Sequence, residues 1–153
     1  MAFTGSFKCT AGKLALIKGE VLIGHTFKLA LYSNTATLDA TTAAYVAGGG
    51  ATGELATLNG YTLAGLTVVP SAATGTGSPL PTTMVYWDIV TDPQWTVTGG
   101  GFTCRGALLY DDTHASDVAI AVIDFGSDQV VTAGTFTIVL PDPTKETPLL
   151  AFD

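Results

Sequence analysis

Two histidines and several aspartates are the residues of this sequence that could take part in acid–base chemistry or bind a cation. His25 precedes an expected strand and has no acid or nucleophile motif beside it in the sequence, which favours a structural or surface role. His114 lies in a polar segment with three aspartates, Asp111, Asp112 and Asp117. A calcium loop of the EF-hand type needs regularly spaced acids, a central glycine and a distant glutamate. Because that spacing is absent, solvated loop carboxylates are the favoured interpretation and a cation site is the alternative.

Asp88 and Asp124 are the pair of carboxylates that could flank a glycosidic bond, since both are expected near strand ends. Such a hydrolase needs its carboxyl groups within about 10 Å of each other, which the sequence does not decide. The motifs Gly-x-Ser-x-Gly, Gly-x-x-x-x-Gly-Lys and His-Glu-x-x-His are absent from the chain. We therefore expect no enzyme, and no catalytic, cofactor-binding or metal-binding residue.

Five aromatic residues could form a sugar-stacking platform: Tyr61, Tyr86, Trp87, Trp95 and Tyr110. Aromatic side chains on strands more often fill a core or a subunit interface, and that is the favoured interpretation.

The two cysteines, Cys9 and Cys104, lie far apart in the sequence. Their spacing fits neither a zinc motif nor a disulfide framework, so we expect free thiols.

The composition limits the class of function. The 153 residues are 47% hydrophobic and only 12% charged, with a net charge of −7, and Lys and Arg total 6. So few basic residues argue against nucleic-acid binding. So sparse a charge is poor at keeping a free monomer soluble, and we expect much of the surface to contact other subunits or a larger assembly.

The charge is unevenly distributed along the chain. Residues 1–51 carry four lysines against two acids, a net charge of +2, whereas the rest carries two basic residues against eleven acids, a net charge of −9. This asymmetry could help neighbouring copies attract one another, and solvated surface lysines are the alternative. We expect the N-terminal segment, residues 1–25, to contact neighbouring subunits. The start of the chain lacks the pattern of a signal peptide, and no apolar run is long enough to span a bilayer, so we expect synthesis in a cytosol and no membrane contact.

Two apolar segments, residues 104–110 and 118–126, flank the polar tip and predict a central β-hairpin. Both segments are apolar at odd and even positions alike, which predicts strands that are covered on both faces. The carboxylates of the tip suit a solvated loop.

The other elements are predicted around this hairpin. A helix is expected over residues 7–18, with Phe7, Leu14 and Ile17 on one face and Gly19 at its end. Strands are expected at residues 26–32, 61–69, 82–89, 130–132, 134–140 and 149–152, with a bulge or close approach at Gly65 and a stop at Pro70.

The connections between these elements are also predicted. Residues 33–60, which we name the excursion, predict a long surface segment with one helical turn at residues 41–45, and an interface is its favoured role. Turns or loops are expected at residues 71–81, 92–95, 99–101 and 126–129. The prolines within residues 141–143 are expected to end the strand at residues 134–140.

The pattern as a whole predicts one domain, residues 1–153. We expect an all-β fold, an antiparallel, jelly-roll-like β-sandwich of about eight strands with one short N-terminal helix.

Several of these segments resemble a group of small structural proteins of tailed bacteriophages. The similar motifs include Phe-Thr-Cys-Arg-Gly-Ala at residues 102–107 and Ile-Asp-Phe-Gly at residues 123–126, together with residues 26–33, 60–65, 92–95, 110–113 and 134–136. The resemblance extends from residue 7 to residue 140, and Cys104 departs from it, standing where a small residue such as alanine is expected.

The resemblance implies a virion component without catalytic residues. A capsid decoration or cement protein is the first expectation, and a tail or tail-fibre accessory protein that binds a host glycan or a neighbouring tail protein is the second. The expected partners are further copies of the chain, as a trimer, and the major capsid protein or a tail protein.

Overall fold

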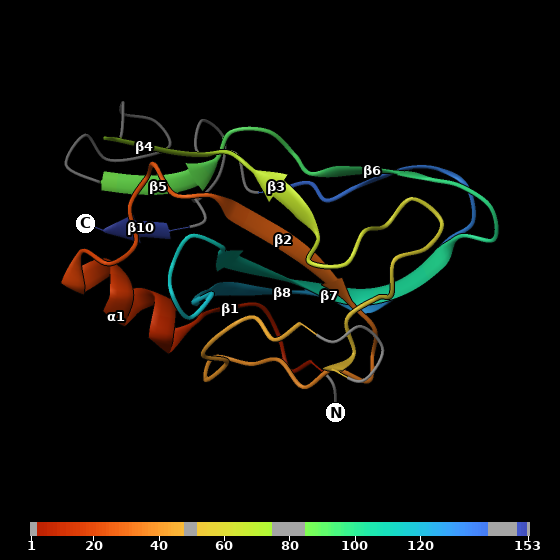
Figure 1. Ribbon diagram of the computed structural model, residues 1–153, viewed down its shortest axis with the longest axis horizontal. Coiled ribbons are helices and arrows are strands. Elements are labelled where there is room, and N and C mark those ends of the chain that lie inside the picture. Colours follow the sequence, from red (N-terminus) through yellow and green to blue (C-terminus); the bar gives the residue numbers. More distant parts are fainter. Residues whose placement is uncertain (1–2, 48–51, 75–84, 141–149, 153) are drawn as a thin grey trace.

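The computed structural model describes residues 3–47, 52–74, 85–140 and 150–152 (Figure 1). This part of the chain contains one helix, α1 (Thr10–Lys18), and ten strands. The strands are β1 (Phe7–Lys8), β2 (Phe27–Tyr32), β3 (Leu66–Val68), β4 (Pro70–Thr74), β5 (Val85–Ile89), β6 (Gln94–Val97), β7 (Phe102–Asp111), β8 (Ala119–Val131), β9 (Gly134–Thr137) and β10 (Leu150–Phe152). The predicted all-β antiparallel fold with one short helix is confirmed.

A five-stranded antiparallel sheet with the order β1-β8-β7-β2-β3 forms the middle of the molecule (Figure 1). The other strands form a three-stranded sheet, β10-β5-β4, and a two-stranded sheet, β6-β9. In this view β4, β5 and β6 lie above β2, and β10 lies at the left. The predicted hairpin is β7 and β8, the two central strands, whose apolar sequences require cover on both sides.

Both faces of the five-stranded sheet are covered. On one face, Leu109 packs in a core cluster with Trp87 and Trp95 of the smaller sheets. On the other face, Leu108 packs with Leu38 and with Tyr45 of the excursion. Because neighbouring strand residues point to opposite faces, the burial of both Leu108 and Leu109 confirms the prediction of two covered faces.

The helix α1 packs through its small residues, which corrects the predicted face. Gly12 and Ala15 are its buried residues, whereas Leu14 and Ile17 are exposed. A Cβ atom at Gly12 would lie 2.6 Å from the carbonyl oxygen of Ala119, so only glycine lets the helix approach β8 this closely. The predicted helix also starts too early, because Phe7 belongs to β1. Its predicted end is confirmed by the left-handed conformation of Gly19.

The strand predicted at residues 61–69 is shorter in the structure. Only Leu66–Val68 forms β3, and Pro70 begins β4 instead of ending the strand before it. Proline has no N–H to donate to the hydrogen-bond ladder, and the first position of a strand is one of the few places in a sheet that tolerate this loss. The close approach at Gly65 is confirmed, since a Cβ atom there would collide with the carbonyl oxygen of Leu29.

Three further boundaries were wrong. The turn predicted at residues 126–129 is a large bulge inside β8, opposite the step from Cys104 to Gly106. Residues 94–95 belong to β6 and not to a turn, because they pair with β9. The helical turn predicted at residues 41–45 is instead an isolated bridge from Ala44 to Val118.

The predicted strand at residues 134–140 ends at residue 137, and the predicted loop at residues 71–81 begins as β4. Predictions for residues 48–50, 75–84 and 141–149 lie outside the described residues. Within the described ranges, no helix is long and apolar enough to cross a membrane.

Candidate functional site

The two histidines attach the hairpin tip to the segment between α1 and β2. The Nδ1 atom of His25 lies 2.6 Å from the Oδ2 atom of Asp111, whose side chain is fully buried. The other carboxylate oxygen of Asp111 accepts hydrogen bonds from the N–H groups of Thr113 and His114. One sequence interpretation is therefore wrong, because Asp111 is not a solvated loop carboxylate. His25 has no acid beside it in the sequence, but it contacts one in the folded chain. The antiparallel pairing of β2 with β7 brings these residues together across 86 positions of the chain.

The rest of the tip is held by weaker contacts with the same segment and with β2. The Nε2 atom of His114 lies 3.9 Å from Glu20, and Asp112 forms an ion pair of 2.9 Å with Lys28. Because these side chains are partly exposed, each pair contributes at most about 1 kcal/mol. Among the described residues, no group of three or more His, Cys, Asp or Glu side chains could hold a metal ion.

The carboxylates proposed for a hydrolase lie on separate sheets. Asp88 belongs to β5, where it is 3% exposed and accepts a hydrogen bond from the N–H of Ile89. Asp124 belongs to β8 and lies 3.0 Å from Nε of Arg105. Burial alone would raise the pKa of Asp124, but the hydrogen bonds from Arg105 and from the N–H of Gly126 outweigh it and lower that pKa. A surface pocket of about 370 Å³ includes Asp124 among its lining residues but not Asp88.

The aromatic residues considered for sugar stacking are core residues. Tyr61, Trp87, Trp95 and Tyr110 are each no more than 7% exposed. Trp87 packs edge-on against Phe27 with ring centroids 5.1 Å apart. The core interpretation is confirmed for these four, and the side chain of Tyr86 lies outside the described set.

Both cysteines are free and buried, which confirms the prediction of free thiols. Burial raises the pKa of the Cys9 thiol to about 11 and that of the Cys104 thiol to about 12. Since the thiolate is the nucleophile, neither residue is a reactive cysteine at neutral pH.

A buried carboxylate that the sequence analysis missed fixes the excursion to the sheet. Glu54 is 1% exposed and accepts three hydrogen bonds of 2.8 Å, from the Tyr45 hydroxyl, the Tyr61 hydroxyl and the N–H of Ala64. Burial and then the proximity of Glu54 raise the pKa values of both tyrosines, which stay protonated as donors. The ring of Tyr45 also stacks on that of Tyr110, with centroids 4.3 Å apart. The sequence contained one signal for this site. Glu54 is the one glutamate of the excursion, and Tyr45 and Tyr61, which can donate hydrogen bonds to it, precede and follow it in the sequence.

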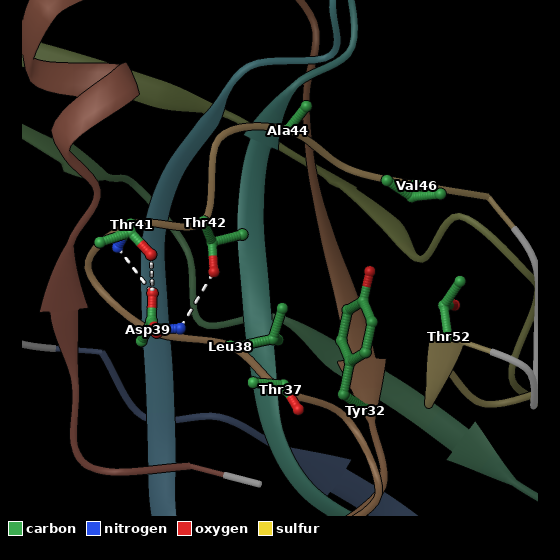
Figure 2. Close-up of a pocket in the computed structure, with 9 residues that line it drawn as sticks. All are labelled: Tyr32, Thr37, Leu38, Asp39, Thr41, Thr42, Ala44, Val46 and Thr52. Atoms are coloured by element: carbon green, nitrogen blue, oxygen red, sulfur yellow. Dashed lines mark hydrogen bonds between the residues drawn. The ribbon is translucent and has the colours of Figure 1, made fainter.

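The excursion and Tyr32 of β2 line a pocket of about 380 Å³ on this face of the sheet, which we name the excursion pocket (Figure 2). Its lining residues are Tyr32, Thr37, Leu38, Asp39, Thr41, Thr42, Ala44, Val46 and Thr52. Figure 2 shows Asp39 bonded to Thr41 and Thr42 at one side, with Tyr32 and Thr52 at the other. The hydrogen bonds from Thr41 lower the pKa of Asp39, so the pocket carries one carboxylate, and none of its described lining residues is basic.

Exposed apolar side chains gather at the N-terminal helix. Leu14 and Ile17 of α1 are 51% and 81% exposed, and Leu22 and Ile23 just after it are 54% and 50% exposed. We name these four residues the α1 patch. Leu14 and Ile17 are three positions apart and therefore share one side of the helix. Lys13 and Lys18 flank them, and α1 contains no acidic residue.

A second apolar surface lies where β3 leads into β4. Val69 and Val90 are 63% and 62% exposed, and the N–H of Val90 donates to the carbonyl oxygen of Val69 at 2.9 Å. Beside them is a groove of about 320 Å³, which we name the β3–β4 groove, lined by Leu66, Thr67, Val68, Val69, Thr91, Asp92, Pro93 and Gln94. Asp92 is the one charged residue of this lining set.

These surfaces, rather than an acid–base cluster, are the candidate functional sites of the described part of the chain. In comparisons with known proteins, no family model, no curated protein and no solved structure matches the chain.

Proposed function

We propose that the chain is a non-enzymatic structural protein of a tailed-phage virion, and that it is a capsid decoration or cement protein that stabilises the head. The α1 patch carries this proposal. Its four large apolar side chains are each at least half exposed, and all four belong to one stretch of the N-terminal segment, residues 14–23. Removing a leucine or isoleucine side chain completely from water contributes about 1.5–3 kcal/mol, so this patch favours a bound neighbour.

The low charge of the chain and its resemblance to small phage structural proteins support the same role. Only 12% of the residues are charged, so many surface positions are compatible with contact to another protein. Many copies on a shell are held by the sum of weak contacts, and each contact needs only a small apolar area. The proposed partners are further copies, as a trimer, and the major capsid protein.

The test uses virions of the phage that encodes the chain. Heads and tails are separated, and the chain is located in one fraction by mass spectrometry. Virions with the gene deleted, or carrying Ile17→Glu, are then heated until the heads release DNA. We expect the chain in the head fraction and release at a lower temperature in both mutants, whereas Val130→Glu, at an exposed position of β8, behaves as wild type. Release at an unchanged temperature in the deletion would contradict the cement role.

The excursion pocket supports the second candidate, a tail or tail-fibre accessory protein that binds a host surface glycan or a neighbouring tail protein. Threonine and tyrosine hydroxyls donate and accept hydrogen bonds as sugar hydroxyls do. Four threonines and one tyrosine line the pocket, together with the apolar residues Leu38, Ala44 and Val46. Recovery of the chain in the tail fraction, with glycan binding by the purified protein on an array that Thr42→Val weakens, would favour this candidate.

A further inference from the structure

We infer that copies of this chain associate with each other head to tail, the α1 patch of one copy lying in the β3–β4 groove of the next. This inference deepens the proposed function and rests on it, because it names the first partner of the assembled protein as a second copy. Three observations carry it: the apolar character of both surfaces, their opposite charges and their separate positions in the fold.

The two surfaces match in apolar character. Ile17, the most exposed large apolar side chain of the described residues at 81%, projects from α1 beside Leu14. The β3–β4 groove has an apolar lining from Leu66, Val68, Val69 and Pro93. A few side chains that fill well-packed, desolvated pockets near the centre of an interface contribute most of its binding free energy. Ile17 in the groove would be such a side chain.

The charges of the two surfaces are opposite. Lys13 and Lys18 flank the exposed residues of α1 and outnumber the one acid near them, Glu20, which lies 3.8 Å from Lys18. Asp92 is the one charged side chain that lines the groove. A groove-bound helix would thus bring lysine close to Asp92. Packing two α1 patches against each other would instead bring four lysines together with only two glutamates, and an excess of like charge at an interface disfavours the wrong pairing. The same asymmetry holds along the whole sequence, with a net charge of +2 in residues 1–51 and of −9 in the remainder.

The two surfaces also belong to different parts of the fold. The α1 helix lies against β8, at the lower left of Figure 1, and the groove lies at the connections from β3 to β4 and from β5 to β6. In a contact between two different surfaces, each copy uses its α1 patch for one neighbour and its β3–β4 groove for the other. Repetition of that contact closes into a ring when the rotation between copies allows it.

The test is native mass spectrometry of the purified full chain over a range of concentrations. Wild type is compared with Ile17→Glu, which damages the patch, and with Val69→Glu, which damages the groove. Both positions are more than half exposed, so the fold should persist, and circular dichroism checks it. We expect wild type to form a closed oligomer and Val130→Glu to match it. Each of the two other variants should associate at least about tenfold more weakly and stay monomeric at concentrations where wild type is assembled.

The decisive sample is an equal mixture of the two variants. The intact patch of Val69→Glu can lie in the intact groove of Ile17→Glu, so we expect a complex with one copy of each, although neither variant assembles alone. Assembly that survives both substitutions, a mixture that stays monomeric, or a wild type that remains monomeric at every concentration would each overturn the inference. A monomeric chain that is nevertheless found on phage heads would overturn only this inference, whereas an oligomer that is absent from virions would overturn only the proposed function.

Discussion

The His25 ring and the Asp111 carboxylate meet 2.6 Å apart at the end of the central hairpin, where Asp111 is fully buried and His25 is mostly covered. This contact joins the start of β2 to the end of β7 and holds the segment that follows the α1 patch. The order of that segment therefore depends on a buried polar contact as well as on apolar packing.

Replacing Asp111 should destabilise the fold more than replacing its neighbour. Asp111→Ala leaves His25 and two N–H groups without their acceptor, which we expect to lower the free energy of unfolding by about 3 kcal/mol. Asp112→Ala removes only a partly exposed ion pair with Lys28 and should cost less than about 1 kcal/mol. Urea unfolding measures both, and equal losses would show that the buried contact does not hold the hairpin tip.

Glu54 should fix the excursion to the sheet through its two tyrosines. Glu54→Leu leaves the O–H donors of Tyr45 and Tyr61 and the N–H of Ala64 without their acceptor, with an expected loss of about 3 kcal/mol. Tyr61→Phe should cost more than Tyr45→Phe, because the Tyr61 hydroxyl also accepts a hydrogen bond from the N–H of Leu31. Thermal or urea unfolding of the three variants gives the order, and a reversed order of the two tyrosine variants would contradict it.

Gly12 should be required for the packing of α1 on β8. Alanine favours a helix over glycine by about 1 kcal/mol, but the added Cβ would lie 2.6 Å from the Ala119 oxygen and 2.8 Å from Cα of Ile120. We therefore expect Gly12→Ala to be destabilising despite the better helix propensity. Gly24→Ala is the matched control, since nothing lies within 4 Å of its added atom. A Gly12→Ala protein as stable as wild type would show that the helix is not in close contact with β8.

The ion pair of Asp124 with Arg105 should make stability depend on pH in the acid range. The lowered pKa of Asp124 means that the folded state binds a proton there less readily than the unfolded state. Its contribution is therefore complete above the unfolded pKa of about 4 and is lost as the pH falls through the lower folded value. The difference in unfolding free energy between wild type and Asp124→Asn should shrink from pH 6 toward about pH 2. A difference that is constant across this range would contradict the assignment.

The two thiols should be unreactive in the folded protein. Burial raises the pKa values of Cys9 and Cys104 to about 11 and about 12, so almost no thiolate exists at pH 8. Labelling with a chromogenic disulfide reagent should be slow in native buffer and reach both cysteines in denaturant. Rapid labelling of the native protein would show that a cysteine is exposed by local opening.

The sequence predicted those features that depend on local patterns. The continuous apolar arms of β7 and β8 required two covered faces, and both Leu108 and Leu109 are buried. Gly19 ends α1 in the left-handed conformation that its position after the helix indicated. Apolar periodicity and the conformation of a glycine that ends a helix act over a few residues and can be recognised without a structure.

The remaining features depend on contacts between distant segments. His25 and Asp111 are 86 positions apart, so no local spacing marks them as a pair. The face of α1 was predicted from its large apolar residues, but the close approach of Gly12 to β8 reverses it and leaves Ile17 exposed. Side-chain size alone does not reveal a helix that packs through its smallest residues, and the α1 patch could therefore not be predicted.

The most direct test of the proposed structural role is a cryo-EM map of the virion that contains the chain. We expect copies on the outer surface of the head, with Ile17 and its neighbours in the α1 patch covered by an adjacent protein. A particle that lacks the chain, or copies whose α1 patch faces solvent throughout, would contradict the account.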